Sequence, residues 1–286
     1  MASPVGKGMR MGQLAGRVAV ITGGARGQGR SHAVTLAAEG ADIVLCDIAA
    51  PIASVPYPLS SEDDLAQTVE LVEETGRRCV AVQADVRSRV EMDGLAERAV
   101  AEFGRIDILL ANAGIASGAA VAEMDEQMWQ DMIDVNLTGV FHSFRAVLPH
   151  MIERRWGRIV ATSSIVGRMG AAKSGHYAAA KWGVIGLVKS LAHEVIPHGI
   201  TVNAVLPAGV RTDMIMNPAM YSAMVPDIDN PTLEDVEAMF AAAPPNGDLI
   251  VPQEVSHAIL LLLGESGRHF NGEAITISGG MSAGTT

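Results

Sequence analysis

The stretch "VAVITGGARGQGR", residues 18–30, runs from an apolar, β-branched segment through a cluster of glycines into a segment with helical character. A strand, a glycine-rich turn and a helix in this order begin the βαβ unit that binds a dinucleotide. The first glycine permits the tight turn, the second lets the backbone approach a pyrophosphate, and the third allows close helix packing. The loop residues expected at the nucleotide are Gly23, Arg26, Gly27, Gln28 and Gly29.

Asp47 ends the next strand, roughly 20 residues beyond the glycines. A carboxylate there accepts hydrogen bonds from a ribose 2'-hydroxyl and repels a 2'-phosphate, so the sequence predicts NAD rather than NADP. Arg26 is the competing signal, because a cation beside the loop could meet a 2'-phosphate. We favour a solvated loop charge for Arg26 while Asp47 is present.

The rest of the chain alternates short β-branched runs with longer helical patterns. Strands that are apolar throughout are covered on both faces, which predicts an α/β fold: one doubly wound Rossmann domain with a seven-stranded parallel sheet. The expected strands are 17–22, 42–47, 78–84, 107–111, 158–163, 201–206 and 273–277. The expected helices are 27–39, 62–75, 88–103, 136–154, 175–197 and 252–263.

The expected domain covers residues 16–286 and follows a flexible leader at 1–15, which lacks the apolar region of a secretory signal. The net charge of -11 argues against nucleic acid or an anionic membrane surface as a partner. No apolar run reaches the length of a membrane span, so we expect a cytoplasmic protein. The two cysteines are expected to be buried and reduced, and no metal-ligand spacing occurs.

Two segments interrupt the α/β pattern. Residues 48–61, "IAAPIASVPYPLSS", place three prolines where a connection of a few residues is usual, and are interpreted as an inserted loop. Residues 207–251 are rich in Pro, Met, Ala and Asp and follow the sixth strand. Because ligands bind outside the carboxyl ends of parallel strands, this segment is placed to form a substrate lid.

Two further strand ends carry residues expected at the nucleotide. Asp85 and Val86 close the third strand, where an adenine edge could be read, although Asp85 is alternatively an N-cap for the next helix. The fourth strand ends in Asn112, Ala113 and Gly114. Asn112 alternatively satisfies neighbouring backbone groups, and Gly114 leaves room for a flat ligand.

Tyr177 and Lys181, in "SGHYAAAKWG" (residues 174–183), stand four positions apart in a helical segment and so share one face. Hydride transfer to or from a secondary alcohol requires a group that moves the hydroxyl proton. A phenol is a poor base at neutral pH unless a cation lowers its pKa, and Lys181 is placed to do so. Tyr177 alone would more often be a packing aromatic.

Across residues 16–280 the chain resembles the short-chain dehydrogenase/reductase family. The matching motifs are "TGGARGQG", "DV" (85–86), "NAG" (112–114), "VNLTGVF" (135–141), "SS" (163–164), "YAAAK" (177–181) and "PAGVRT" (207–212). The resemblance implies that Tyr177 is the acid/base and that Lys181 lowers its pKa and holds the nicotinamide ribose. It also implies that Ser164 bonds the substrate oxygen and that Asn136 anchors a relay water. Ser164 could instead cap a turn, and Asn136 could cap its helix.

The resemblance also implies that the segment after the sixth strand contacts the nicotinamide. Its residues are Pro207, Gly209, Val210 and Thr212, of which Thr212 could bond the carboxamide or a phosphate. The chain departs from the usual pattern at Ala208, where many members have Pro-Gly, and at Ala111, where a second asparagine is usual. The first departure puts the backbone path near the carboxamide in doubt.

A narrower resemblance comes from "GARGQGRSHA" and the insertion "DIAAPIASVPYPLSSEDDL", which are similar to carveol dehydrogenase-like, mycofactocin-dependent enzymes. It implies a tightly bound NAD that stays in place through turnover and is reoxidised by a mycofactocin-type redox carrier. The insertion follows Asp47, so it could fold over the adenosine half of the nucleotide. A subunit-contact loop is the alternative.

The predicted function is an NAD-dependent oxidoreductase that interconverts an apolar secondary alcohol, carveol-like or otherwise alicyclic or terpenoid, and its ketone. The lid supplies flexible thioethers that suit an apolar ligand, although they could simply pack the lid: Met214, Met216, Met220, Met224 and Met239. Alternatives are an NADPH-dependent ketone reductase and a non-catalytic nucleotide-binding regulatory protein. The family resemblance implies a homotetramer packed through helices 136–155 and 175–197, whose apolar faces could equally be core.

Overall fold

A computed structural model describes residues 12–225, 227–241 and 248–282 of the chain. Seven parallel strands form one sheet in the order β3-β2-β1-β4-β5-β6-β7, which confirms the predicted fold class. The strands are β1 (Val18–Thr22), β2 (Asp42–Asp47), β3 (Cys79–Gln83), β4 (Ile108–Ala111), β5 (Gly157–Thr162), β6 (Ile200–Pro207) and β7 (Ala274–Ile277).

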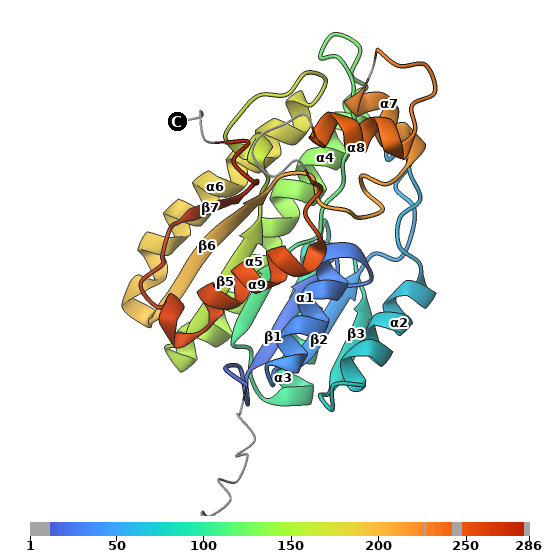
Figure 1. Cartoon of the computed structure of the whole chain (residues 1–286). Helices are drawn as coiled ribbons and strands as arrows, with labels where there is room; N and C mark the ends of the chain where they lie inside the picture. The colour runs from blue at the N-terminus through green and yellow to red at the C-terminus, as the bar shows by residue number, and fades with distance from the viewer. Residues whose placement is uncertain (1–11, 226, 242–247, 283–286) are drawn as a thin grey trace, which may run out of the picture.

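Helices cover both faces of the sheet (Figure 1). One layer consists of α1 (Gly27–Ala38), α2 (Glu62–Glu73) and α9 (Pro252–Leu263), and the other is built mainly from α3 (Arg89–Phe103), α5 (Gly139–Arg154) and α6 (Gly175–Val195). Strand β1 shows why the strands are apolar throughout. Val18 and Val20 pack into the second layer, while Ala19 and Ile21 pack into the first.

The helix predicted at 136–154 is longer and more irregular than expected. An additional helix, α4 (Glu126–Ile133), starts at the N-cap Asp125 and continues through one π-helical turn, Asp134–Thr138, into α5. The polar composition of α4 hid it, because only Asp131 and Met132 are buried in it. A π turn rotates the side chains around it and is frequent at functional sites. Here it carries Asn136, which is fully buried.

The segment predicted as a lid contains two short helices, α7 (Pro218–Met224) and α8 (Leu233–Ala241). They lie beyond the carboxyl end of β6, at the end of the molecule shown at the top of Figure 1. Residues 226 and 242–247 of the predicted lid lie outside the described residues.

The predicted leader is wrong at its carboxyl end. Residues 1–11 lie outside the described residues, but Leu14 is buried in the α1 and α9 layer of the core. The Leu14 N–H donates to the Glu39 carbonyl at the end of α1. The folded domain therefore includes residue 14, two residues before the predicted boundary at residue 16.

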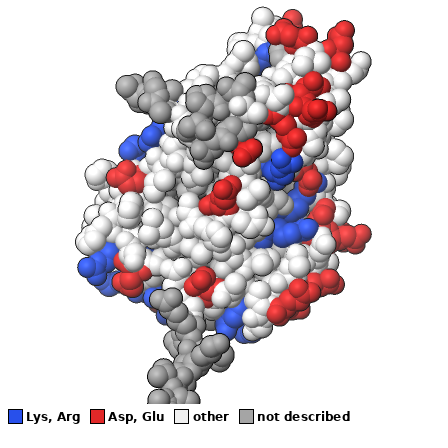
Figure 2. All heavy atoms as spheres, in the orientation of Figure 1, with Lys and Arg blue, Asp and Glu red and all other residues white. Residues whose placement is uncertain are grey.

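The surface is acidic at the lid end of the molecule. Figure 2 shows acidic side chains gathered over the end that carries α7 and α8. Glu234 and Asp235 lie in the first turn of α8, where the helix dipole favours negative charge. Within the described residues, no helix is long and apolar enough to cross a membrane, and no group of three or more metal-ligating side chains occurs.

Two glycine substitutions test whether close packing between α1 and the glycine-rich turn stabilises the fold. A Cβ on Gly29 would lie 1.9 Å from the Gly23 carbonyl oxygen, so Gly29→Ala should destabilise the protein by about 1–3 kcal/mol through overpacking. Gly94, exposed within α3 with open space around its would-be Cβ, is the matched control. Gly94→Ala should stabilise the protein by about 0.5–1 kcal/mol. Thermal unfolding measures both; equal shifts of Tm would contradict this account.

Candidate active site

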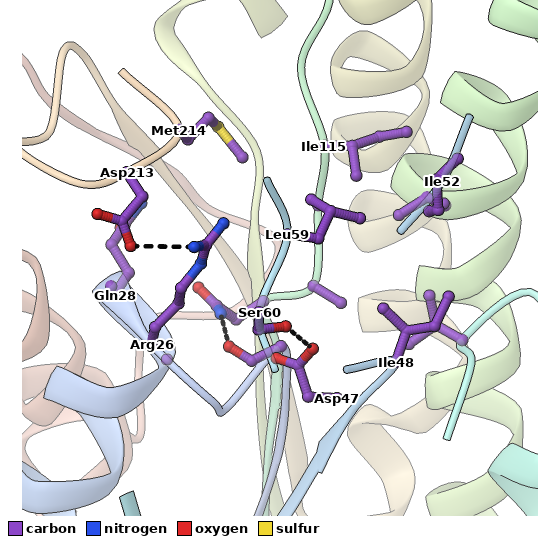
Figure 3. A pocket seen from close by; sticks show the side chains of 18 of the residues that line it. Arg26, Gln28, Asp47, Ile48, Ile52, Leu59, Ser60, Ile115, Asp213 and Met214 are labelled. Carbon is purple, nitrogen blue, oxygen red and sulfur yellow. Dashed lines mark hydrogen bonds and ion pairs between the residues drawn. The ribbon is translucent and has the colours of Figure 1, made fainter. Parts of the chain in front are cut away.

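A cleft opens at the carboxyl edge of the sheet. Its walls come from six segments: the glycine-rich turn, the end of β2 with the insertion, the end of β3, the end of β4, the π-helical turn before α5, and the start of the lid. Figure 3 shows Leu59, Ile115 and Met214 around one part of it and Asp47 with Ser60 at another. Ligand clefts lie at this edge of doubly wound sheets.

The glycine-rich turn forms the part of the cleft that fits a pyrophosphate. Gly23 and Gly27 have φ angles of 66° and 56°, a left-handed conformation that favours glycine. Within the described residues, no side chain caps the first N–H groups of α1. These N–H groups and the helix dipole suit an anion, as expected from the sequence.

Asp47 is the centre of a hydrogen-bond network at the end of β2. Its carboxylate accepts the Ala25 N–H (3.1 Å) from the glycine-rich turn and the Ala49 N–H (3.2 Å), together with the Ser60 hydroxyl from the insertion (Figure 3). A carboxylate has about four acceptor positions, so one stays open among the described residues. That open position on Oδ2 fits a ribose hydroxyl of a dinucleotide.

Arg26 is not the solvated loop charge that the sequence favoured. Its guanidinium donates to the Pro58 carbonyl (2.5 Å) and pairs with Asp213 of the lid (3.3 Å), leaving its side chain 21% exposed. Figure 3 shows the ion pair with Asp213 at the edge of the cleft. Arg26 therefore joins the glycine-rich turn to the insertion and to the lid, and is neither a solvated charge nor free for a 2'-phosphate.

The insertion folds inward and forms one wall of the cleft. Ile52 and Tyr57 are buried, and both line the cleft. The position beside Asp47 agrees with the prediction, but the insertion extends further: the Tyr57 hydroxyl accepts the Ala116 N–H at 3.0 Å, beyond the end of β4. A loop that served only as a subunit contact would not bury these side chains within its own chain.

Asp85 and Val86 line the cleft at the end of β3, as predicted. The alternative for Asp85, a helix N-cap, is wrong, because Ser88 caps α3 by accepting the Glu91 N–H. The Asp85 carboxylate instead bonds the Arg87 guanidinium, and the pKa of Arg87 is raised. The adenine contact remains a prediction.

The end of β4 shapes the middle of the cleft, which Asn112, Ala113 and Gly114 all line. Asn112 donates to the carbonyls of Thr22 and Gly23 (3.1 and 3.2 Å), so its backbone-satisfying alternative is confirmed. A Cβ on Gly114 would lie 2.8 Å from Oδ1 of Asn136 and 3.5 Å from Nζ of Lys181. Gly114 thus brings the cleft close to the catalytic lysine expected from the sequence.

Ser164, Tyr177 and Lys181 come together beside this point. Ser164 caps the short helix after β5 by accepting the Val166 N–H, which confirms its interpretation as a cap, and it lies close enough to Tyr177 to lower the pKa of that phenol. Its bond to a substrate oxygen stays a prediction. The Lys181 ammonium donates to the Thr162 carbonyl at 2.9 Å and lies 5.5 Å from the centre of the Tyr177 ring. Ser163, the near neighbour, points elsewhere and donates to the Lys181 carbonyl.

The predicted lowering of the Tyr177 pKa is absent in the protein alone. Burial raises the pKa of Tyr177, and the bond with Ser164 opposes this shift only in part. Burial lowers the pKa of Lys181 to about 8. The ammonium is engaged by Thr162 and lies over the ring, so its effect on the phenol is smaller than the spacing in sequence indicated.

Asn136 does not cap a helix. Its Oδ1 accepts the Ile115 N–H (3.2 Å), while its Nδ2 donates to the Ile115 and Met132 carbonyls (both 3.1 Å). The side chain therefore fixes the segment after β4. The predicted relay water stays a prediction.

The segment after β6 was expected to contact the nicotinamide, and only one of its four predicted residues lines the cleft. Thr212 lines the cleft and lies against Gly27, but Pro207, Gly209 and Val210 are not among the cleft-lining residues. A Cβ on Gly209 would lie 2.3 Å from the Phe240 ring of α8, so this glycine seats the lid helix instead.

Several cleft residues were not expected from the sequence. The missed residues are Ile48, Ile52, Tyr57, Leu59, Ser60, Ala84, Ile115, Val135 and Asp213, whereas Met214 was expected from the lid. For the insertion, the one available signal was its apolar residues, which a solvent loop would not need. The others depend on how the chain folds back.

Comparisons with known proteins agree with this geometry. The pattern of the family described as short chain dehydrogenase matches residues 17–220. The chain belongs to this family. It is 44% identical to (-)-trans-carveol dehydrogenase of Rhodococcus erythropolis over 276 residues, covering 94% of this chain and 99% of the relative.

Two solved structures of short-chain dehydrogenases resemble the whole fold. Carveol dehydrogenase from Mycobacterium avium, in complex with NAD, matches with a TM-score of 0.90 at 42% identity and covers 95% of this chain and 99% of that one. A short chain dehydrogenase from Mycobacterium paratuberculosis bound to NAD matches with a TM-score of 0.86 at 36% identity, over 95% of this chain and all of that one.

The direction of the Tyr177 pKa shift can be tested by titration. Because its pKa is raised, less than half of the Tyr177 phenol should be ionised at pH 10, the usual midpoint for tyrosine. Tyr177→Phe should therefore remove less than half of one tyrosine's full phenolate absorbance at pH 10 from the folded protein. Unfolding in denaturant serves as the control and should reveal the missing tyrosine. Loss of one tyrosine's absorbance from the folded variant would mean that the pKa is not raised.

Proposed function

We propose that this short-chain dehydrogenase is an NAD-dependent oxidoreductase that interconverts an apolar secondary alcohol and its ketone. The observation that carries the proposal is the convergence of Ser164, Tyr177 and Lys181 next to Gly114, a residue that lines the same cleft as Asp47. Two relatives of similar length support the proposal. One is the (-)-trans-carveol dehydrogenase of Rhodococcus erythropolis, and the other is the carveol dehydrogenase of Mycobacterium avium, whose structure is a complex with NAD.

NAD, when bound, supplies the acceptor for a hydride. Tyr177 would exchange the hydroxyl proton through its phenol oxygen, and Ser164, which lowers the pKa of that phenol, would hold the substrate oxygen beside it. Lys181 is held at 2.9 Å from the Thr162 carbonyl, near Gly114, where it would meet the nicotinamide ribose. With its pKa at about 8, Lys181 remains cationic at neutral pH and would favour the phenolate.

NAD is favoured over NADP by the environment of Asp47. The carboxylate lines the cleft with one open acceptor position, which suits a hydroxyl donor and repels a phosphate. Arg26, the cation that could have compensated, is occupied by Pro58 and Asp213.

We also propose that the nucleotide is tightly bound and stays in the protein through turnover. The insertion covers one wall of the cleft, and Arg26 ties it to the glycine-rich turn and to the lid. A retained NAD must be reoxidised in place, so a redox carrier of the mycofactocin type would have to reach the site.

An apolar substrate is supported by the cleft residues near the lid. Leu59, Ile115 and Met214 line the cleft. The two arginines of this region, Arg26 and Arg211, are both paired with carboxylates and are not available to bind a substrate anion. Of the other lid methionines, Met216, Met224 and Met239 pack with the lid's own core, as their alternative interpretation stated. A carveol-like or other alicyclic or terpenoid alcohol fits this chemistry.

The proposed assembly is a homotetramer packed through α5 and α6. Phe141 on α5 and Trp182 on α6 are 46% and 51% exposed, which is unusual for large apolar side chains. The cytoplasmic location stays a prediction.

The function is tested by combining turnover with native mass spectrometry. Purified protein should carry NAD and oxidise carveol-like alcohols to ketones when an artificial electron acceptor is supplied. Tyr177→Phe should lower kcat by about 100-fold or more, because the proton-transfer group is lost. Its nucleotide content and circular dichroism should stay unchanged, which controls for misfolding. Full activity in this variant would rule out the proposed mechanism.

A further inference from the structure

Three side chains from three different elements hold three consecutive residues after β4. Asn136 of the π turn bonds both backbone groups of Ile115. The Tyr57 hydroxyl accepts the Ala116 N–H at 3.0 Å. His176 bonds the Ser117 hydroxyl through Nε2 at 2.9 Å. Residues 115–117 are therefore fixed from three directions, and the segment is largely buried.

The segment 115–117 forms the link between the insertion and the catalytic helix. His176 directly precedes Tyr177 in the first turn of α6, and Gly114 lies beside Lys181. A shift of Ala116 would therefore displace both the helix that carries Tyr177 and Gly114, the cleft residue beside Lys181.

Tyr57 itself lies near the reacting groups. It lines the cleft, and only 7% of its surface is exposed. Burial raises its pKa to about 12, the bond from Ala116 opposes this rise, and negative charge on Tyr177 adds to it. Tyr57 lines the same cleft as Gly114, whose would-be Cβ lies 3.5 Å from Nζ of Lys181, although Tyr57 is 120 positions earlier in the chain than Tyr177.

We propose that Tyr57 is a positioning residue of the active site, through which the insertion holds residues 115–117 in register with the helix that carries Tyr177 and Lys181. The proposal rests on the proposed function and deepens it. The insertion then has a role at the reacting end of the cleft, in addition to its place beside Asp47. A protein with the same catalytic side chains but without this tyrosine would hold them less accurately.

Tyr57→Phe isolates the hydroxyl, because it keeps the ring that fills the space beside the cleft. The variant leaves the Ala116 N–H without its acceptor. Ser54→Ala is the matched control, since it removes another tether of the same insertion: the Ser54 hydroxyl donates to Asp131 of α4 at 2.7 Å. Any effect of loosening the insertion in general should appear in both variants.

Amide hydrogen exchange measures the protection of the Ala116 N–H by Tyr57 directly and needs no substrate. The Ala116 amide should exchange about tenfold faster in Tyr57→Phe than in the parent protein, and at the parent rate in Ser54→Ala. Equal protection of Ala116 in all three proteins would overturn the proposal. Because this measurement is independent of turnover, its failure is distinct from failure of the proposed function.

Kinetics then test positioning. In Tyr57→Phe, kcat should fall about tenfold with KM nearly unchanged, because the reacting groups are misplaced while the ligand surface is kept. Ser54→Ala should keep the parent kcat. Combining Tyr57→Phe with Ser117→Ala should lower kcat by less than the product of the two single effects, since both act on one segment. Unchanged kcat in Tyr57→Phe, or an equal loss in Ser54→Ala, would overturn the proposal.

Discussion

The buried carboxylate of Asp47 is the constraint on which the rest of the cleft depends. A carboxylate at the end of a buried strand is costly unless donors surround it. The chain supplies these donors from both sides: Ala25 from the glycine-rich turn, and Ala49 and Ser60 from the insertion. The same bonds that satisfy Asp47 therefore fix the turn that would receive a pyrophosphate and the loop that forms the facing wall. A single acceptor position stays open toward the cleft among the described residues.

A few polar contacts join the cleft-lining segments that are distant from one another in sequence. Arg26 connects the turn before α1 to Pro58 of the insertion and Asp213 of the lid. At the other end of the cleft, Tyr57 connects the insertion to Ala116. The insertion thus contacts both the nucleotide end of the cleft, at Asp47, and the segment after β4 that lies near the expected catalytic residues.

Much of this architecture could be predicted from the sequence. The strands are apolar on both faces, and the glycines with Asp47 mark the nucleotide end, so the parallel sheet and the edge that carries the cleft followed from local pattern. Helix α4 could not be found in the same way, because it is short, mostly polar and mostly solvent-exposed. The partners of Arg26 and Tyr57 depend on how a proline-rich loop folds back across the cleft. The raised pKa of Tyr177 depends on burial, which the four-residue spacing from Lys181 does not reveal.

The most direct measurement of the central claim is nucleotide binding by protein freed of any retained nucleotide. Titration calorimetry with NAD and with NADP compares the two dissociation constants under the same conditions. If the open acceptor position of Asp47 faces the adenosine ribose, NAD should bind at least about tenfold more tightly than NADP, a difference of about 1.4 kcal/mol. Equal affinities, or tighter binding of NADP, would contradict the assignment of Asp47 and with it the orientation of the whole cleft.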